Sequence, residues 1–224
     1  MAAPIHAGVL VPWANSVVEA ELPRQAPDQV VWHYSRLVPA NEDTALNTHF
    51  LTGLIEAVPQ AVEQLSALRL RIIYLACTSA AFMFSEMVSE VTSGRKLPIV
   101  TAFESIVGTL RDRHIGRIAL CAPYPADVTN NEASMFDKAG IEVVEYATLG
   151  LSDGYADVQP QQIRTMTARL SRENVKNAEA IVLSCTGWPT LGLERPLQQR
   201  FGMPVISSNR AMAAHALSLN GAHQ

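Results

Sequence analysis

The sequence has few charges, few cysteines and no long apolar run. Only 17% of the 224 residues are charged, the net charge is -4, and Lys and Arg form no cluster, which argues against nucleic acid or an anionic membrane surface as a partner. Three cysteines without paired spacing make no disulfide framework. No run approaches the roughly 18 apolar residues of a membrane span. The N-terminus also lacks the basic region of a signal peptide, so we expect a cytoplasmic protein.

Motifs for metals and common cofactors are also missing. The six histidines show no metal-ligand spacing, and neither HExxH nor CxxC occurs. There is no P-loop and no GxGxxG after a strand. The sequence therefore predicts a protein without metal or cofactor. Hydrophobic residues make up 48% of the chain, enough for one large α/β domain or two half-size ones.

Short apolar runs alternate with segments of helical character. The runs predict strands at 7–11, 30–37, 70–76, 97–101, 117–122, 141–147, 180–184 and 203–207. Ser16 and Glu19 have the spacing of a capping box, so a helix is expected to begin there. Alternation of this kind is typical of parallel sheets covered by helices on both faces, so we predict the α/β class.

The pattern occurs twice. Val11-Pro12-Trp13 matches Ala122-Pro123-Tyr124, Cys77-Thr78 matches Cys185-Thr186, and Pro98 matches Pro204, at offsets of 111, 108 and 106 residues. Any α/β chain has chance coincidences of this kind, but three in register favour a duplication. We predict two similar halves, 1–115 and 116–224, related by a pseudo-two-fold axis, with the active site in the cleft between them. The last helix is a candidate to cross over to the first half.

Cys77 and Cys185 each stand at the carboxyl end of a predicted strand, where ligands bind in open α/β sheets. Backbone N–H groups of the helix or turn that follows bind carboxylates and favour thiolate over thiol. Thr78, Ser79 and Thr186 add hydroxyl donors. Gly187 lets the backbone approach a ligand closely. The sequence thus predicts two thiols that face one small carboxylate substrate.

At each of these positions the alternative interpretation is an ordinary structural role. Free cysteine is usually a small buried hydrophobe, and we assign that role to Cys121, which lies inside a strand. Two cysteines at matched places favour function instead. Asn15 is either a turn residue or a carboxylate ligand, and Tyr124 is the candidate hydroxyl donor of the second half. Trp13 and Trp188 are either walls of the cavity or ordinary packing.

Together these motifs resemble a known family. The set Pro12-x-x-Asn15-x-x-x-Glu19, Ala76-Cys77-Thr78-Ser79, Ala122-Pro123-Tyr124-x-x-Asp127-Val128, Leu183-Ser184-Cys185-Thr186 and Pro204-Val-Ile-Ser207-Ser208-Asn209 resembles maleate cis-trans isomerase, in the aspartate/glutamate racemase superfamily that also holds arylmalonate decarboxylase. Amino-acid racemases usually have Asn-Thr after the first cysteine, where this chain has Thr78-Ser79. Arylmalonate decarboxylase has glycine in place of the first cysteine, whereas this chain has Cys77 there. We therefore favour the isomerase interpretation.

The resemblance implies cofactor-independent isomerisation of maleate or a related small cis-dicarboxylate. Cys77 would add to the olefinic carbon as a thiolate, and Cys185 would act as acid and base from the other side. Asn15, Tyr124 and the turns at Thr78–Ser79 and Thr186–Gly187 would hold the carboxylates. A two-cysteine racemase or epimerase, an arylmalonate-type decarboxylase and a non-catalytic carboxylate-binding domain remain alternatives.

Three positions depart from the family pattern. Trp13 stands where a small residue is expected, and Ala80 replaces an expected glycine. The loop after Leu149-Gly150 should supply a substrate-binding asparagine, and the nearest match is Gly154. We also expect the chain to form a homo-oligomer.

Overall fold

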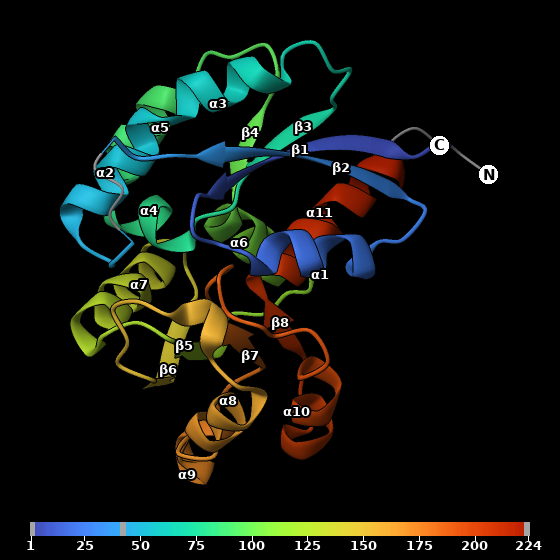
Figure 1. The fold of residues 1–224 in the computed structure, drawn as a ribbon. Coiled ribbons are helices and arrows are strands. Elements are labelled where there is room, and N and C mark those ends of the chain that lie inside the picture. The colour runs from blue at the N-terminus through green and yellow to red at the C-terminus, as the bar shows by residue number, and fades with distance from the viewer. Residues whose placement is uncertain (1–2, 41–43, 222–224) are drawn as a thin grey trace.

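The computed structural model describes residues 3–40 and 44–221. Within them the chain forms two four-stranded parallel sheets, each covered by helices (Figure 1). The blue-to-green first half lies above the yellow-to-red second half in that view. The predicted α/β class and the two similar halves are confirmed.

In the described part of the first half there are four strands and six helices. They are β1 (Ile5–Pro12), α1 (Val17–Gln25), β2 (Val30–Leu37), α2 (Thr48–Glu56), α3 (Val58–Leu65), β3 (Ile72–Leu75), α4 (Thr78–Met83), α5 (Ser85–Thr92), β4 (Ile99–Thr101) and α6 (Ala102–Asp112).

The second half follows with four more strands. Its elements are β5 (Arg117–Ala122), α7 (Ala126–Lys138), β6 (Glu142–Thr148), the 3₁₀ helix η1 (Tyr155–Asp157), α8 (Pro160–Thr167), α9 (Arg172–Val175), β7 (Ala180–Leu183), α10 (Glu194–Phe201), β8 (Val205–Ser207) and α11 (Ser208–Gly221).

The two sheets have the same strand order. The first reads β2-β1-β3-β4 and the second β6-β5-β7-β8, so the first strand of each half pairs with its second and third strands. All pairs are parallel. The carboxyl ends of β1 and β3 therefore lie side by side, as do those of β5 and β7. We propose that the boundary between the halves lies at residue 116.

Burial on both faces explains the apolar strands. Every residue of β1 except His6 is buried, and β3 and β7 are buried throughout. One face of the first sheet packs with α1, and the other packs against α2 and α3. A strand covered on both sides needs a continuous apolar run, which is why the runs are readable in the sequence.

Helix α11 belongs to the second half in sequence but packs with the first half in space. Its residues Met212, Ala213 and Ala216 share a core with Val9 and Val11 of β1. In Figure 1 this red helix lies beside α1 and α6. The chain end therefore ties the two halves together.

One local prediction was wrong. Ser16 makes no side-chain cap at α1; the Asn15 side chain accepts from the N–H groups of Val17 and Val18 instead, and Glu19 pairs with Arg36. The segment from Pro160 to Val175 forms two short helices, because the chain turns between Thr167 and Arg172.

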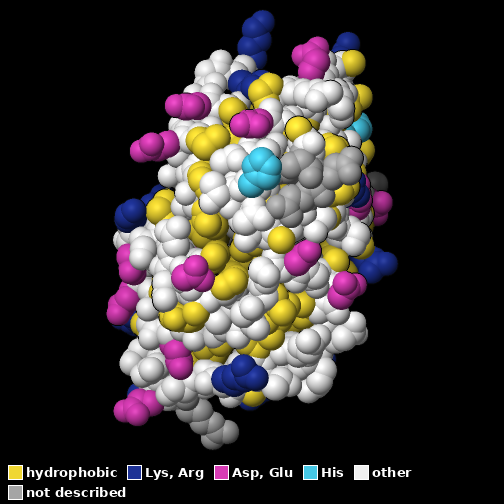
Figure 2. Space-filling model, turned by 60° about the vertical axis from the view of Figure 1, so that its left-hand side comes forward, with side chains coloured by type: hydrophobic (Ala, Val, Ile, Leu, Met, Phe, Trp, Pro, Cys, Tyr) yellow, Lys and Arg dark blue, Asp and Glu magenta, His cyan; other side chains and the backbone are white. Residues whose placement is uncertain are grey.

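The outer surface shows no strong feature in Figure 2. On that face, acidic and basic side chains are scattered among apolar ones and the basic side chains form no patch. Among the described residues, no helix is both long enough and apolar enough to span a membrane.

Candidate active site

A cavity of about 320 Å³ lies between the two halves, and all eight predicted site residues line it. They are Asn15, Cys77, Thr78, Ser79, Tyr124, Cys185, Thr186 and Gly187. The other lining residues are Pro12, Ala14, Thr44, Leu46, Phe50, Asp153, Gly154, Tyr155, Ala156 and Asp157. The first half contributes residues up to Ser79 and the second half contributes the rest.

The two thiols occupy the same place in their halves. Cys77 stands two residues after β3 and Cys185 two residues after β7, and each side of the cavity receives one of them. Their residues are 6% and 5% exposed, so both sulfurs are reached only from the cavity. The duplication therefore sets two thiols across one space.

The Cys77 sulfur has two donors from the first turn of α4, the helix that follows it. The backbone N–H of Ala80 bonds it, and the Ser79 hydroxyl lies 3.6 Å from it. Burial raises the pKa of the Cys77 thiol above its ordinary value, and these two hydrogen bonds act in the opposite direction.

The Cys185 sulfur has a matching pair of donors. The Gly187 backbone N–H donates to it at 3.2 Å, and the Tyr124 hydroxyl lies within hydrogen-bonding reach. Burial raises the pKa of Cys185 to about 12, while Tyr124 and Gly187 lower it by less. The Cys185 backbone has φ of 143°, a conformation that L-residues rarely adopt. Such strain is found at functional sites.

Burial opposes the expected preference for thiolate over thiol. Loss of water around a buried sulfur disfavours the charged form more than the nearby N–H and O–H groups favour it, so the pKa of both thiols is raised. A donor or acceptor that favours the thiolate of Cys77 must therefore come with the substrate.

Asn15 and Thr186 form a bridge across the cavity between the halves. The Asn15 amide nitrogen donates to the Thr186 hydroxyl at 3.1 Å, and that hydroxyl donates to the carbonyl of Ala76 at 2.7 Å. A hydroxyl carries one proton, so the Thr186 side chain has none left for a substrate. In this arrangement the Thr186 proton is directed to Ala76, and its role as a donor to the substrate stays a prediction, whereas Asn15 keeps one N–H for a ligand.

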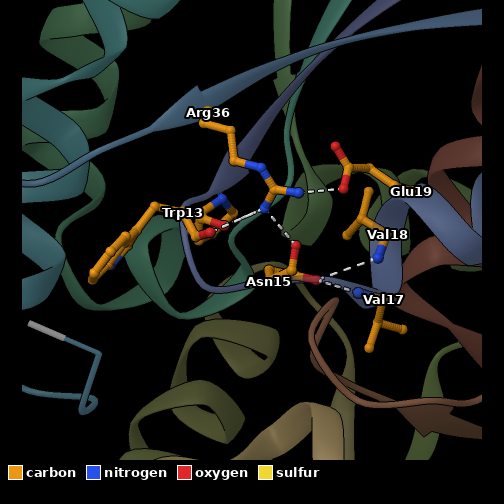
Figure 3. Close-up of polar contacts among 7 residues, drawn as sticks. Trp13, Asn15, Val17, Val18, Glu19 and Arg36 are labelled. Atoms are coloured by element: carbon orange, nitrogen blue, oxygen red, sulfur yellow. Dashed lines mark hydrogen bonds and ion pairs between the residues drawn. The ribbon is translucent and has the colours of Figure 1, made fainter. Parts of the chain in front are cut away.

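Arg36 holds the loop that carries Asn15 (Figure 3). One nitrogen of its guanidinium donates to the carbonyl oxygens of Trp13 and Asn15 at 3.1 and 2.8 Å, and another pairs with Glu19. In Figure 3 the Asn15 side chain points from this loop toward Val17 and Val18 at the start of α1. The loop is thus fixed from both sides.

A second link joins the two cysteine loops. The Ser208 hydroxyl, at the start of α11, accepts from the Cys185 backbone N–H at 3.0 Å and lies 3.3 Å from the Thr78 hydroxyl. If Ser208 donates to Thr78, the Thr78 proton is free for a ligand.

Several lining residues were not predicted. Tyr155, Asp153 and Asp157 lie on the loop after β6, whose place at the carboxyl end of a strand was a usable signal. No local pattern marks Thr44, Leu46 or Phe50. Thr44 and Leu46 are placed by contacts across the cavity mouth, Thr44 to Asp153 and Leu46 to Ser152.

The two tryptophans do not line the cavity. Trp188 is fully buried in the core of the second half, and Trp13 packs against the core beside α2 and α3. Ordinary packing was the correct reading for both. The expected asparagine after Gly150 is absent from the lining, where Gly154 stands between two aspartates of the same loop. Among the described residues, no group of three or more His, Cys, Asp or Glu is placed to hold a metal ion.

Known proteins with this architecture include isomerases and decarboxylases. The chain is 25% identical to a maleate isomerase of Geobacillus stearothermophilus over 227 residues, which cover 93% of this chain and 88% of that one. The maleate isomerase structure from Pseudomonas putida S16 superposes with a TM-score of 0.85 at 22% identity, over 97% and 93% of the two chains. An arylmalonate decarboxylase structure gives a TM-score of 0.75 at 23% identity, over 98% and 94%.

The family assignment rests on a match over nearly the whole chain. The sequence model of a protein family, described as arylmalonate decarboxylase, matches residues 7–224 of this chain. That range includes both thiols, the Asn15 loop and Tyr124. The chain therefore belongs to the arylmalonate decarboxylase family.

Proposed function

We propose that the protein is a cofactor-independent cis-trans isomerase of maleate or a related small cis-dicarboxylate. One observation carries this proposal: two thiols, one from each half, line a single cavity. Each sulfur has one backbone N–H and one hydroxyl within reach. Arylmalonate decarboxylase has glycine in place of the first cysteine, so the resemblance implies that decarboxylation uses only the second thiol.

The reaction uses Cys77 as nucleophile. Cys77 first loses its proton to solvent water at the open cavity mouth, and the thiolate adds to one olefinic carbon. The electron pair of the double bond moves to the neighbouring carbon, and that carbon takes the proton of Cys185. The former double bond is now single and rotates. Cys185, left as thiolate, removes the proton, the double bond re-forms in the trans geometry and the Cys77 thiolate leaves.

The surroundings of the two sulfurs support this division of roles. A pKa of about 12 keeps Cys185 protonated, as a proton donor requires. The Ala80 N–H and the Ser79 hydroxyl stabilise a negative charge on Cys77. Thr78, Ser79, Tyr124 and the free N–H of Asn15 are the donors for the substrate carboxylate.

Relatives support the same chemistry. Four curated relatives named maleate isomerase match between 90% and 93% of the chain at 23–25% identity. A similar structure is a Cys-to-Ser mutant of Nocardia farcinica maleate cis-trans isomerase with a covalently bound succinylcysteine intermediate, at a TM-score of 0.83 and 20% identity. Addition of a thiol to maleate gives that adduct.

Proton NMR of maleate incubated with the protein tests the proposal. We expect the vinyl signal of the cis acid to be replaced by that of the trans acid. Cys121→Ser is the matched control, because Cys121 is a buried core cysteine that does not line the cavity. Absence of conversion with maleate and with related cis-acids would refute the isomerase.

A racemase or epimerase uses the same pair of thiols and differs in its readout. It exchanges the Cα proton of an amino or hydroxy acid with solvent deuterium, which isomerisation does not require. Deuterium at Cα without cis-trans conversion assigns the racemase instead. Assembly as a homo-oligomer and location in the cytoplasm stay predictions from the sequence.

A further inference from the structure

The charges around the cavity are of one sign. Among the residues that the structure describes, the lining contains two carboxylates, Asp153 and Asp157, and no Lys, Arg or His. A dicarboxylate that binds there is a dianion at neutral pH, and no cationic side chain compensates either of its charges. Proteins usually pair a bound carboxylate with Arg, Lys or a cluster of N–H donors.

The donors for an anion gather at one end of the cavity. Asn15, Ser79 and Tyr124 surround the two thiols and are buried. Asp153 and Asp157 are exposed and therefore mark the mouth, where Leu46 of the first half meets the loop of the second. The thiol end suits one carboxylate, whereas the mouth is acidic and partly apolar.

The charge of Asp153 is held in place. One carboxylate oxygen accepts from the Thr44 hydroxyl at 2.8 Å and the other from the Gly154 N–H at 2.7 Å. Each of the two carboxylate oxygens thus has one hydrogen-bond donor, and these bonds fix the orientation of the side chain. The Asp153 side chain thus ties the two loops of the mouth together while it presents a negative charge.

Asp153 and both thiols act on the same neighbour, the Tyr155 hydroxyl. Burial, followed by the charges of Cys185, Asp153 and Cys77, raises the pKa of the Tyr155 hydroxyl far above its usual range. The Tyr155 ring also packs edge-on against Tyr124, with ring centroids 5.7 Å apart. A second carboxylate of a substrate in this region is therefore within the field of Asp153.

We propose that the preferred substrate is a monoanion, the half-amide of a cis-butenedioic acid. Its free carboxylate binds at the thiol end and its carboxamide N–H groups donate to the carboxylates of Asp153 and Asp157. This inference rests on the proposed isomerase function and names its substrate class. The bonds made and broken are those already given, since the amide takes no part in the addition or the elimination.

The test compares kcat/KM for maleate and for maleamate, its half-amide. With the wild-type protein at neutral pH we expect maleamate to be preferred about tenfold or more, a factor that corresponds to one unfavourable charge contact in a partly buried site. Asp157→Asn and Asp153→Asn should each reduce the preference about three- to tenfold by raising kcat/KM for maleate. High salt should act in the same direction.

Asp137→Asn is the matched control. Asp137 is an exposed aspartate of α7 outside the cavity, so the same charge change should leave the ratio of the two kcat/KM values unchanged. Asp157→Asn keeps the test decisive if Asp153→Asn loosens the mouth, because the Thr44 hydroxyl bonds Asp153.

The outcomes separate the two proposals. If maleate is converted at least as well as maleamate and the variants leave the ratio unchanged, the half-amide inference is wrong and the isomerase stands. If the wild-type protein converts neither compound, the isomerase proposal fails and the inference falls with it.

Discussion

The two halves share a plan and differ in its chemical details. Strand order, the place of each cysteine, and a backbone N–H plus a hydroxyl at each sulfur are common to both. Cys77 has an ordinary extended backbone, whereas Cys185 has φ of 143°. The hydroxyl near Cys77 comes from Ser79 in the first turn of α4, and that near Cys185 comes from Tyr124 after the end of another strand, β5. Duplication supplies the positions, and later divergence assigns the roles.

A pair of buried glutamates shows the same divergence. Glu21 and Glu132 each follow the matched prolines, Pro12 and Pro123, by nine residues. Glu21 crosses to the second half, where it accepts from Thr190, Leu191 and Asn209. Glu132 stays in its own half and accepts only from the Ser184 hydroxyl, with its other oxygen buried and unpartnered. One position thus became a link between the halves and the other a buried acid.

The largest expected effect on activity comes from removing each of the two thiols in turn. Cys77→Ser should lower kcat by about 10⁴-fold or more, as expected for a nucleophile. Cys185→Ser should lower kcat by about 10²- to 10⁴-fold, as expected for an acid and base. Intact-protein mass spectrometry should find a substrate adduct on Cys77 in Cys185→Ser. An adduct on Cys185 in Cys77→Ser, with none in the converse variant, would show that the roles are reversed.

The next test removes the hydroxyl that only the second half supplies. Tyr124→Phe should lower kcat about 10- to 100-fold, the value of a hydrogen bond to a charged sulfur. Because this bond lowers the pKa of Cys185, its loss should raise that pKa and shift alkylation of Cys185 to higher pH. Tyr146→Phe, at an exposed tyrosine of β6, should leave both measurements unchanged. An unshifted alkylation profile in Tyr124→Phe would contradict the assigned bond.

The two glutamates should respond in opposite ways to the same substitution. Glu21→Gln places an amide among four donors and should lower the free energy of unfolding by about 1–3 kcal/mol, measured by denaturant. Burial raises the pKa of Glu132 to about 8, against an ordinary value of 4.5. Glu132→Gln should therefore be close to neutral below about pH 4.5, increasingly stabilising as the pH rises to about 8, and most stabilising above that pH.

The raised pKa of Glu132 determines the direction in which the stability of the fold changes with pH. Between pH 4.5 and about 8 the folded state keeps a proton that the unfolded state loses. Stability should therefore fall as pH rises through this window, by a few kcal/mol at most. Glu132→Gln should remove this slope, and Glu21→Gln should retain it. Equal slopes in the wild type and Glu132→Gln would show that Glu132 is charged throughout.

The smallest expected effect concerns Gly187, whose counterpart in the first half is Ser79. A Cβ at position 187 would lie 3.5 Å from the Asn15 amide nitrogen and 3.6 Å from the Cys185 sulfur. These three residues line the cavity, so the added methyl group would occupy space next to the substrate. Gly187→Ala should raise KM about three- to tenfold, with little change in thermal stability. Gly108→Ala in α6, where a Cβ meets nothing within 4 Å, should leave KM unchanged. An unaltered KM in Gly187→Ala would place the substrate elsewhere.

Predictions from the sequence missed hydrogen-bond partners that come from distant segments. Thr186 was expected to donate to a substrate, and in this structure its proton is directed to Ala76, which is 110 residues away in the chain. Ser16 and Glu19 have capping-box spacing, yet Asn15 caps the helix and Glu19 pairs with Arg36. The spacing of residues in the sequence shows which local hydrogen bonds can form. Which of them do form depends on competing partners that the fold brings close.

The sequence by itself determined the α/β class, the duplication and the places of Cys77 and Cys185, because strands buried on both faces need apolar runs and each cysteine follows such a run. Only the tertiary structure decided that burial raises the pKa of both thiols, that Thr186 serves as a bridge and that Asp153 and Asp157 stand at the cavity mouth. The reason is physical: burial, competing hydrogen-bond partners and electric fields depend on atoms that are close in space and far apart in the chain.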